Sequence, residues 1–209
     1  PPLEALRYIV HRAATRNPNG KDKGIMVNDV SRAFFEAEAK RLVCCELPEG
    51  YPGNEGRDKV GILVKSLYGT RDAAHNWVEE VAKFMKKAGF IRGIYNPCLY
   101  YHPVRDIETL VHGDDFASAA GYPELQWFKK QLEDRFKIKT QIIGDGKGAV
   151  REARILNRIV RCTSDGWEYE PDQRHAELIV KDLGLQEAKS AATPGDKLKD
   201  NEKDDVELN

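Results

Sequence analysis

The chain has 209 residues, of which 41% are hydrophobic and 32% are charged, and its formal net charge is -1. This composition excludes a wholly disordered chain and predicts one domain or one and a half. Because basic and acidic residues balance, the net charge does not indicate nucleic-acid binding, and any basic surface must be local.

In the first half of the chain, apolar periodicity predicts two helices, a helical turn and three strands. In chain order these are a helix at 3–17, a strand at 24–29, a helical turn at 33–35, a strand at 41–47, a strand or extended lead-in at 60–67, and a helix at 71–88. Ser31 is a candidate N-cap for the helical turn. The helix at 71–88 carries the strongest apolar face, and Gly89 ends it.

The second half predicts strands and helices in alternation. They are strands at 98–101, 109–112 and 116–120, a helix at 124–136, a strand at 137–143, a strand at 153–162 paired with another at 167–169, and a helix at 172–183. Gly113, Asp114 and Asp115 separate two apolar strands, which is typical of a hairpin. From residue 186 the sequence is polar and predicts a linker or a frayed tail.

The sequence lacks the usual patterns of membrane spans, signal peptides, zinc sites and disulfide frameworks, which narrows the classes of function to consider. No apolar run approaches the ~18 residues of a membrane span, and the N-terminus does not resemble a signal peptide. Because the chain opens without Met, we expect a piece of a longer protein. The four cysteines form no C-x-x-C pair, so neither a zinc site nor a disulfide framework is expected.

Adjacent acids at the tip of the predicted hairpin are the sharpest chemical feature. Asp114 and Asp115 repel each other, and a divalent cation such as Mg²⁺ would relieve that repulsion. Asp29 ends another apolar strand, where an ionised carboxylate is costly unless it is paired or metal-bound. If the two strands are neighbours, the acids converge into a metal site suited to displacement at a phosphate. A simple turn and an N-cap remain the alternatives.

A basic stretch is the second candidate feature. Residues 129–161 contain ten Lys and Arg against four acidic residues, a net charge of +6, whereas residues 186–209 have a net charge of -3. The basic stretch predicts either a nucleic-acid surface or a solvated face.

Six motifs in a fixed order resemble the reverse transcriptase of copia-type (Ty1/copia) retrotransposon Pol polyproteins. The resemblance extends over about residues 3–195 and includes a block that contains Asp29 and a Val-His-Gly-Asp-Asp block at 111–115. The other motifs are Leu-Pro-Glu-Gly-Tyr at 47–51, Ser-Leu-Tyr-Gly-Thr-Arg-Asp-Ala-Ala-His-Asn-Trp at 66–77, Tyr-Asn-Pro-Cys-Leu-Tyr at 95–100 and Glu-Ala-Lys-Ser-Ala-Ala-Thr-Pro at 187–194.

The resemblance implies an α+β fold: a polymerase palm with a split βαβ, ferredoxin-like antiparallel sheet backed by helices, with most of the fingers missing. It implies a palm with the catalytic motifs at 1–121, a palm end and primer-contacting, thumb-like region at 122–185, and a tail at 186–209. Departures from the family pattern include His112 before the acid pair and Asp72 in place of Gln.

The same resemblance implies the chemistry, which is Mg²⁺- or Mn²⁺-dependent addition of dNTPs to a primer 3′-hydroxyl on an RNA or DNA template. Asp29, Asp114 and Asp115 would be catalytic and, with Val30, would contact metal. Substrate contacts would come from Val30, Phe34, Arg71 and Asp72, with Phe34 as an aromatic gate against a ribose 2′-hydroxyl.

The implied partners are the fingers, integrase and RNase H parts of the same polyprotein, without a membrane. The implied location is cytoplasmic, in a virus-like particle, or nuclear. Two other functions stay open. They are a catalytically inactive remnant of a decayed element and a ferredoxin-like nucleic-acid-binding module.

Overall fold

The computed structural model describes residues 3–15, 22–55, 58–170 and 173–189. The chain forms two compact units, residues 1–171 and residues 172–209. In the second unit the described secondary structure is one helix, α4 (Gln173–Asp182). All other elements belong to the first unit.

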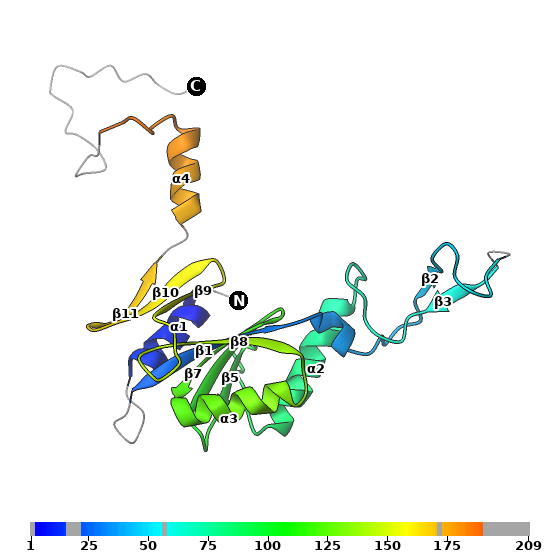
Figure 1. The fold of residues 1–209 in the computed structure, drawn as a ribbon, viewed down its shortest axis with the longest axis horizontal. Coiled ribbons are helices and arrows are strands. Elements are labelled where there is room, and N and C mark those ends of the chain that lie inside the picture. The colour runs from blue at the N-terminus through cyan, green and yellow to red at the C-terminus, as the bar shows by residue number, and fades with distance from the viewer. Residues whose placement is uncertain (1–2, 16–21, 56–57, 171–172, 190–209) are drawn as a thin grey trace. The chain divides into compact units, whose positions relative to one another are not determined.

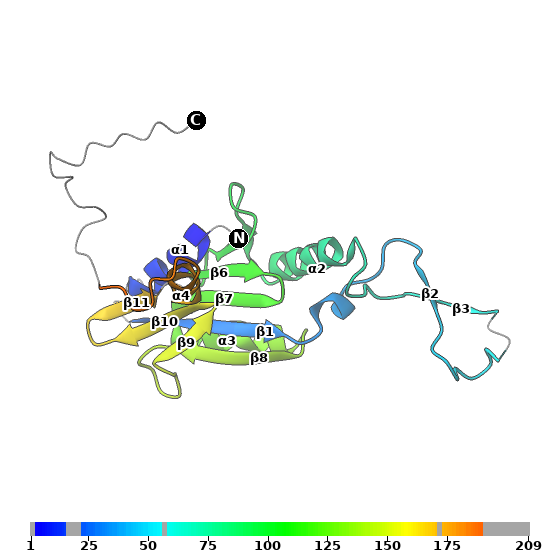
Figure 2. The same cartoon turned by 90° about the horizontal axis from the view of Figure 1, so that it is seen from above.

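A six-stranded antiparallel sheet organises the first unit, with strand order β4-β5-β6-β7-β1-β8. Figure 2 shows β6, β7, β1 and β8 side by side in this order. Its strands are β1 (Lys23–Val30), β4 (Ile91–Arg92), β5 (Leu99–His102), β6 (Ile107–His112), β7 (Asp115–Gly121) and β8 (Ile138–Ile143). In this order β7 lies between β1 and β6, and β1 lies between β7 and β8. The connection through α3 (Tyr122–Glu133), from β7 to β8, therefore skips one strand, β1, whereas the connection that contains α2 (Ala73–Lys87) runs from β1 to β4 at the far edge of the sheet.

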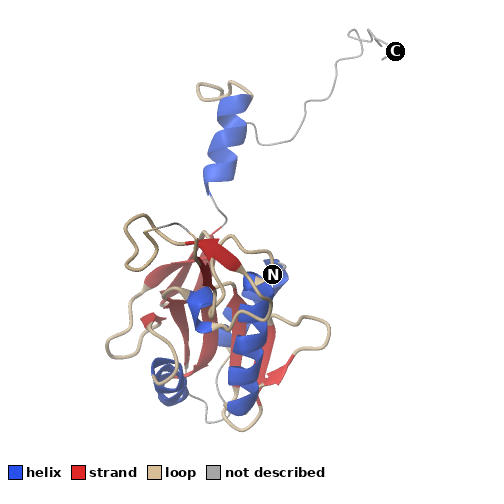
Figure 3. Cartoon of the chain, turned by 90° about the vertical axis from the view of Figure 1, so that its right-hand side faces the viewer, coloured by secondary structure: helices blue, strands red, loops and turns tan. Residues whose placement is uncertain are grey.

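Helices and a small sheet cover the two faces of this sheet (Figures 1 and 3). On one face α2 (Ala73–Lys87) and α3 (Tyr122–Glu133) bury an apolar core. On the other face a second core joins α1 (Leu3–Ala14) to a three-stranded sheet. The strands of that sheet are β9 (Glu152–Ile155), β10 (Arg158–Thr163) and β11 (Gly166–Glu170).

Strand β1 contributes to both cores because neighbouring residues of a strand point to opposite faces. Ile25 and Val27 pack on the α1 side, whereas Met26 and Val30 pack on the α2 side. Asp29 has the same parity as Ile25 and Val27, so β1 directs its carboxylate to the face that carries β9 and β10.

The segment between β1 and α2 holds the shorter elements. A 3₁₀ turn, η1 (Ala33–Glu36), follows β1, and β2 (Cys44–Glu46) pairs with β3 (Val60–Ile62). The strands predicted at 41–47 and 60–67 are therefore present but shorter. The described helices also begin and end within a few residues of their predicted bounds.

Two local predictions are wrong. Ser31 does not cap η1, because the N-cap residue is Arg32, with a left-handed φ of 58° and no side-chain capping bond. The single strand predicted at 153–162 is instead the β9–β10 hairpin, which turns at Leu156 (φ 48°) and Asn157 (φ 63°). Without glycine in that turn, the sequence carries no strong turn signal.

At the level of class, the α+β prediction is confirmed, with antiparallel sheets and four α-helices among the described residues. None of those helices is long and apolar enough to cross a membrane. The tail predicted from residue 186 lies mostly outside the described residues, since only 186–189 are described.

Candidate functional site

Three carboxylates meet at one end of the six-stranded sheet. Asp29 is the second-last residue of β1 and lies directly opposite Asp115, the first residue of β7. Asp114 belongs to the turn that joins β6 to β7. One oxygen from each carboxylate lies within 4.8 Å of the other two. The approach of these acids, predicted from their strand-end positions, is therefore observed.

The turn that carries Asp114 is fixed to the sheet and to a helix. Gly113 has a φ of 61°, a left-handed conformation that glycine adopts without steric cost. The Val30 amide donates to the Asp114 carbonyl oxygen at 3.0 Å. The indole Nε1 of Trp77, on α2, donates to the Gly113 carbonyl oxygen at 2.6 Å. Both carbonyls of the two-residue turn are thus held by separate elements.

The electrostatics of the cluster favour a cation. Burial raises the pKa of Asp115, and the negative charges of Asp114 and Asp29 raise it further. Asp29 and Asp115 are half-buried and Asp114 is exposed. Among the described residues this is the one group of three or more Asp, Glu, His or Cys with ligand atoms this close. Three carboxylates form the hard oxygen donor set that Mg²⁺ and Mn²⁺ prefer, so the residues fit such an ion.

Two neighbours of the acids have limited side-chain roles. The side chain of Val30 is fully buried in the core, so only its main-chain carbonyl could bind a metal. His112 lies opposite Asp115 across the β6–β7 pair, and burial lowers the pKa of its imidazole. A neutral imidazole does not compensate the negative charge of the acids.

Phe34 lies on η1, shortly after β1. Its ring is half-buried and stacks on Tyr68, with the ring centroids 4.4 Å apart. The neighbouring Phe35 is 40% exposed and meets Tyr68 edge-on at 5.6 Å. Of the two rings that contact Tyr68, Phe34 is thus the less exposed and lies nearer to the tyrosine ring.

Asp72 immediately precedes α2, but its side chain does not cap the helix. It accepts a hydrogen bond from Arg41 at 3.1 Å and a longer one, 3.5 Å, from Asn76. The bond from Arg41 is the main cause that lowers the pKa of Asp72. Arg71, the next predicted substrate residue, is exposed. The structure thus brings the three acids together. The hydrogen bonds of Asp72 and the ring contacts of Phe34 described above are made with other residues and do not connect these side chains to the acids.

Beside the acids is a hollow of about 460 Å³ that the sequence did not indicate. One wall is the β6–β7 turn and the other is the β9–β10 turn, which adds Arg154, Leu156 and Asn157. In the sequence, Arg154 stands out only as one charge of the basic stretch. Trp77 stands out as one residue of an apolar helix face and as the last residue of the motif at 66–77, but neither signal indicates a contact with the β6–β7 turn.

Comparison with known proteins places these motifs in a family context. A sequence profile of the family described as reverse transcriptase (RNA-dependent DNA polymerase) matches residues 19–195. The retrovirus-related Pol polyprotein from transposon TNT 1-94 of Nicotiana tabacum is 25% identical over 197 residues, covering 92% of this chain and 14% of that protein. A putative transposon Ty5-1 protein of Saccharomyces cerevisiae is 28% identical over 114 residues, covering 53% of this chain and 37% of that protein. The chain thus spans about a seventh of the first relative and just over a third of the second.

Proposed function

The chain belongs to the reverse transcriptase family of copia-type transposon Pol polyproteins, and from this membership we propose that it forms the palm of an RNA-directed DNA polymerase. The observation that carries the proposal is the convergence of Asp29, Asp114 and Asp115 at one end of the sheet. The strand order supports it, because the α3 crossover from β7 to β8 leaves β1 between the two strands that it connects, as in the split βαβ arrangement expected of a palm.

Asp29, Asp114 and Asp115 would hold Mg²⁺ or Mn²⁺, with the Val30 carbonyl as a further ligand. When bound, such ions lower the pKa of the primer 3′-hydroxyl and stabilise the departing pyrophosphate. The β1–β7 pairing holds Asp29 opposite Asp115, so the protein sets the spacing of these two carboxylates in advance. Asp114 completes the set from the turn.

The remaining parts of the chain receive roles from their position relative to the acids. The hollow between the β6–β7 and β9–β10 turns suits a primer terminus, with Arg154 available to a phosphate. This supports a palm at 1–121 and a primer-contacting region at 122–185, followed by a tail at 186–209. The substrates would be a primed RNA or DNA template and dNTPs, and the partners would be the fingers, integrase and RNase H parts of the polyprotein.

Primer extension tests this proposal. The chain, and the longer Pol segment that contains it, are supplied with a primed RNA template, dNTPs and Mg²⁺. Template-directed extension that requires Asp29 supports a polymerase. Binding of the template without extension would favour a nucleic-acid-binding module, and failure of both would favour an inactive remnant.

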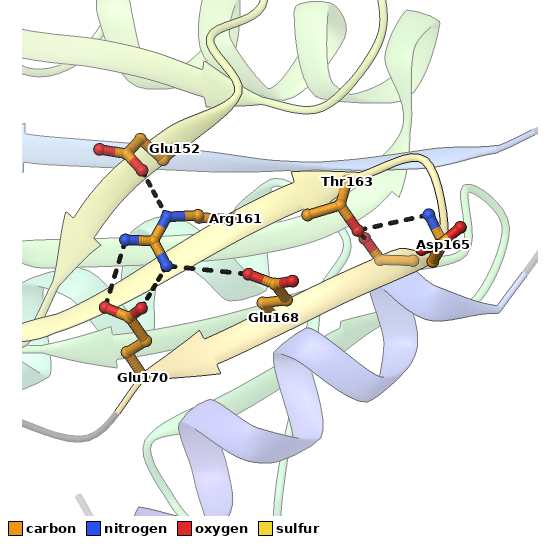
Figure 4. A network of polar contacts seen from close by, with 7 residues as sticks. Glu152, Arg161, Thr163, Asp165, Glu168 and Glu170 are labelled. Atoms are coloured by element: carbon orange, nitrogen blue, oxygen red, sulfur yellow. Dashed lines mark hydrogen bonds and ion pairs between the residues drawn. The ribbon is translucent and has the colours of Figure 1, made fainter.

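The basic stretch gives a prediction about binding because not all of its charges are available. Arg161, on β10, contacts Glu152, Glu168 and Glu170 on the same sheet (Figure 4). Lys139 is exposed and forms no ion pair within the described residues. It lies opposite Asp29 on β8, in the same row as the acids.

Replacing Lys139 with Gln should therefore weaken binding to a primer–template duplex and reduce its dependence on salt. Removing one phosphate contact should lower the slope of log affinity against log salt by about 0.9 for a B-form duplex. Fluorescence anisotropy over a range of salt concentrations measures this slope. Arg161→Gln is the matched control and should change neither affinity nor slope. Equal effects in both variants would contradict the assignment of Lys139.

A second prediction concerns Asp72 at the start of α2. An ionised carboxylate accepts hydrogen bonds but repels a triphosphate, whereas the amide of Gln can donate to it. Because Arg41 already compensates part of the charge, Asp72→Gln should lower the KM for dNTPs by only about 2- to 5-fold, as expected for an exposed pair. Steady-state kinetics of the polymerase-competent Pol segment measure this change.

Glu79→Gln provides the control for Asp72→Gln, because Glu79 is also on α2 and forms an exposed pair with Lys40. The KM should not change in this variant. A KM that also stays unchanged in Asp72→Gln would show that Asp72 does not face the nucleotide.

A further inference from the structure

The β6–β7 turn is held from behind by the side chain of Trp77. This indole is 1% exposed and belongs to the core on the α2 face of the sheet. Asp29 and Asp115 have the opposite parity to the strand residues of this core, and they point to the other face. Trp77 therefore reaches the turn from the side opposite to the proposed metal site, and it does not contact that site through a carboxylate.

The contact itself is specific. The Nε1–H of Trp77 donates at 2.6 Å to the carbonyl oxygen of Gly113, the residue immediately before Asp114. The ring is restrained by an edge contact with Phe136, with centroids 5.3 Å apart. The donor is thus carried by a buried ring on a 15-residue helix, whereas the acceptor lies on an exposed turn.

We propose that Trp77 is a positioning residue for Asp114. Two hydrogen bonds, from Val30 and from Trp77, hold the carbonyls of this turn. The bond from Val30 ties the turn to β1, and the bond from Trp77 fixes its tilt relative to α2. Without the indole N–H, the turn keeps only the first of these restraints, and Asp114 samples orientations that do not face Asp29 and Asp115.

This inference rests on the proposed metal-binding function of the three acids. It predicts that the affinity of the three acids for a cation depends on Trp77, although the indole of Trp77 is not itself a ligand of the cation. The loss of one hydrogen bond to a supporting group should weaken Mg²⁺ binding about 5- to 10-fold.

The test compares Trp77→Phe with Trp127→Phe in the full chain. Phe keeps an aromatic ring but has no N–H donor. Trp127, on α3, packs against His102 and Arg105 rather than the turn, so its variant controls for the loss of an indole. Mg²⁺ affinity is measured by calorimetry, and the indole N–H resonances are followed by ¹H–¹⁵N NMR during a Mg²⁺ titration.

We expect weaker Mg²⁺ binding in Trp77→Phe and unchanged binding in Trp127→Phe. In the unmodified chain, Mg²⁺ should shift the indole resonance of Trp77 and leave those of Trp127 and Trp167 in place. This second readout needs no variant, so it stands even if Trp77→Phe does not fold.

Two negative outcomes have different meanings. Mg²⁺ that shifts the amide resonances of Asp29 and Asp115 but not the Trp77 indole, with unchanged affinity in Trp77→Phe, would overturn the positioning role alone. A chain in which Mg²⁺ shifts none of these resonances would overturn the metal site, and the proposed function with it.

Discussion

Replacing Asp115 with Asn should abolish RNA-directed primer extension and, at the same time, raise the melting temperature of the metal-free protein. Loss of a metal ligand removes several kcal/mol of transition-state stabilisation, which corresponds to about a 1,000-fold loss in rate. The gain in stability has a different cause. In the absence of metal, burial and two neighbouring carboxylates oppose ionisation of Asp115, as its raised pKa indicates.

The size of this gain follows from the repulsion that Asn removes. Two like charges about 4 Å apart in water repel by about 1 kcal/mol, and relief of that energy raises Tm by about 2–4 °C in a chain of this size. Differential scanning fluorimetry with and without Mg²⁺ measures both effects. Mg²⁺ should raise the Tm of the unmodified chain, because it binds the folded state, and should raise that of Asp115→Asn much less.

Asp165→Asn is the control, since Asp165 is an exposed acid in the β10–β11 turn, outside the cluster. It should leave extension, Tm and the Mg²⁺ response unchanged. An Asp115→Asn variant that extends primers normally would remove Asp115 from the catalytic machinery. A fall in its metal-free Tm would mean that the carboxylate stabilises the fold.

Replacing Phe34 with Val should increase the incorporation of ribonucleotides relative to deoxyribonucleotides. The proposed gate excludes a 2′-hydroxyl by contact, and the stack on Tyr68 holds the Phe34 ring in place. Replacing the ring with a smaller side chain removes this contact. A change of this kind alters the discrimination between two substrates by about 1–3 kcal/mol, or roughly 10- to 200-fold. Competitive single-nucleotide extension by the polymerase-competent Pol segment measures the ratio.

Phe35→Val is a matched control, because Phe35 contacts the same tyrosine but is more exposed. Its ratio should stay close to that of the unmodified enzyme. If both variants change discrimination equally, the effect comes from loosening Tyr68 and not from a gate at Phe34. An active Phe34→Val enzyme with an unchanged ratio would reduce Phe34 to a packing residue.

Local sequence patterns predicted most of the elements because their signals lie within a few residues. The apolar face of α2 repeats at helical spacing, and β6 and β7 are apolar segments around a polar turn. The proximity of Asp29 to Asp114 and Asp115 could be anticipated because these acids end or join apolar strands. The structure adds the register, which places Asp29 directly opposite Asp115.

The contacts that the sequence did not reveal are tertiary. Arg41 and Asp72 are 31 positions apart, and the indole of Trp77 meets a carbonyl 36 positions away. Neither pairing leaves a periodic pattern. The left-handed residues Arg32 and Leu156 are similarly hidden, because glycine is the usual signal for that conformation.

The position of β1 between β7 and β8 also has a consequence during synthesis, because β8 is made after β1 and β7. Both acid motifs have been synthesised by residue 115, but β8 begins only at Ile138. Until then β1 is an unprotected sheet edge, with free amide and carbonyl groups between apolar side chains, and such edges recruit strands from other molecules. A nascent or truncated chain that ends just after Gly121 would therefore contain all three acids and yet be prone to aggregate, because the strand that protects β1 comes from beyond the motifs.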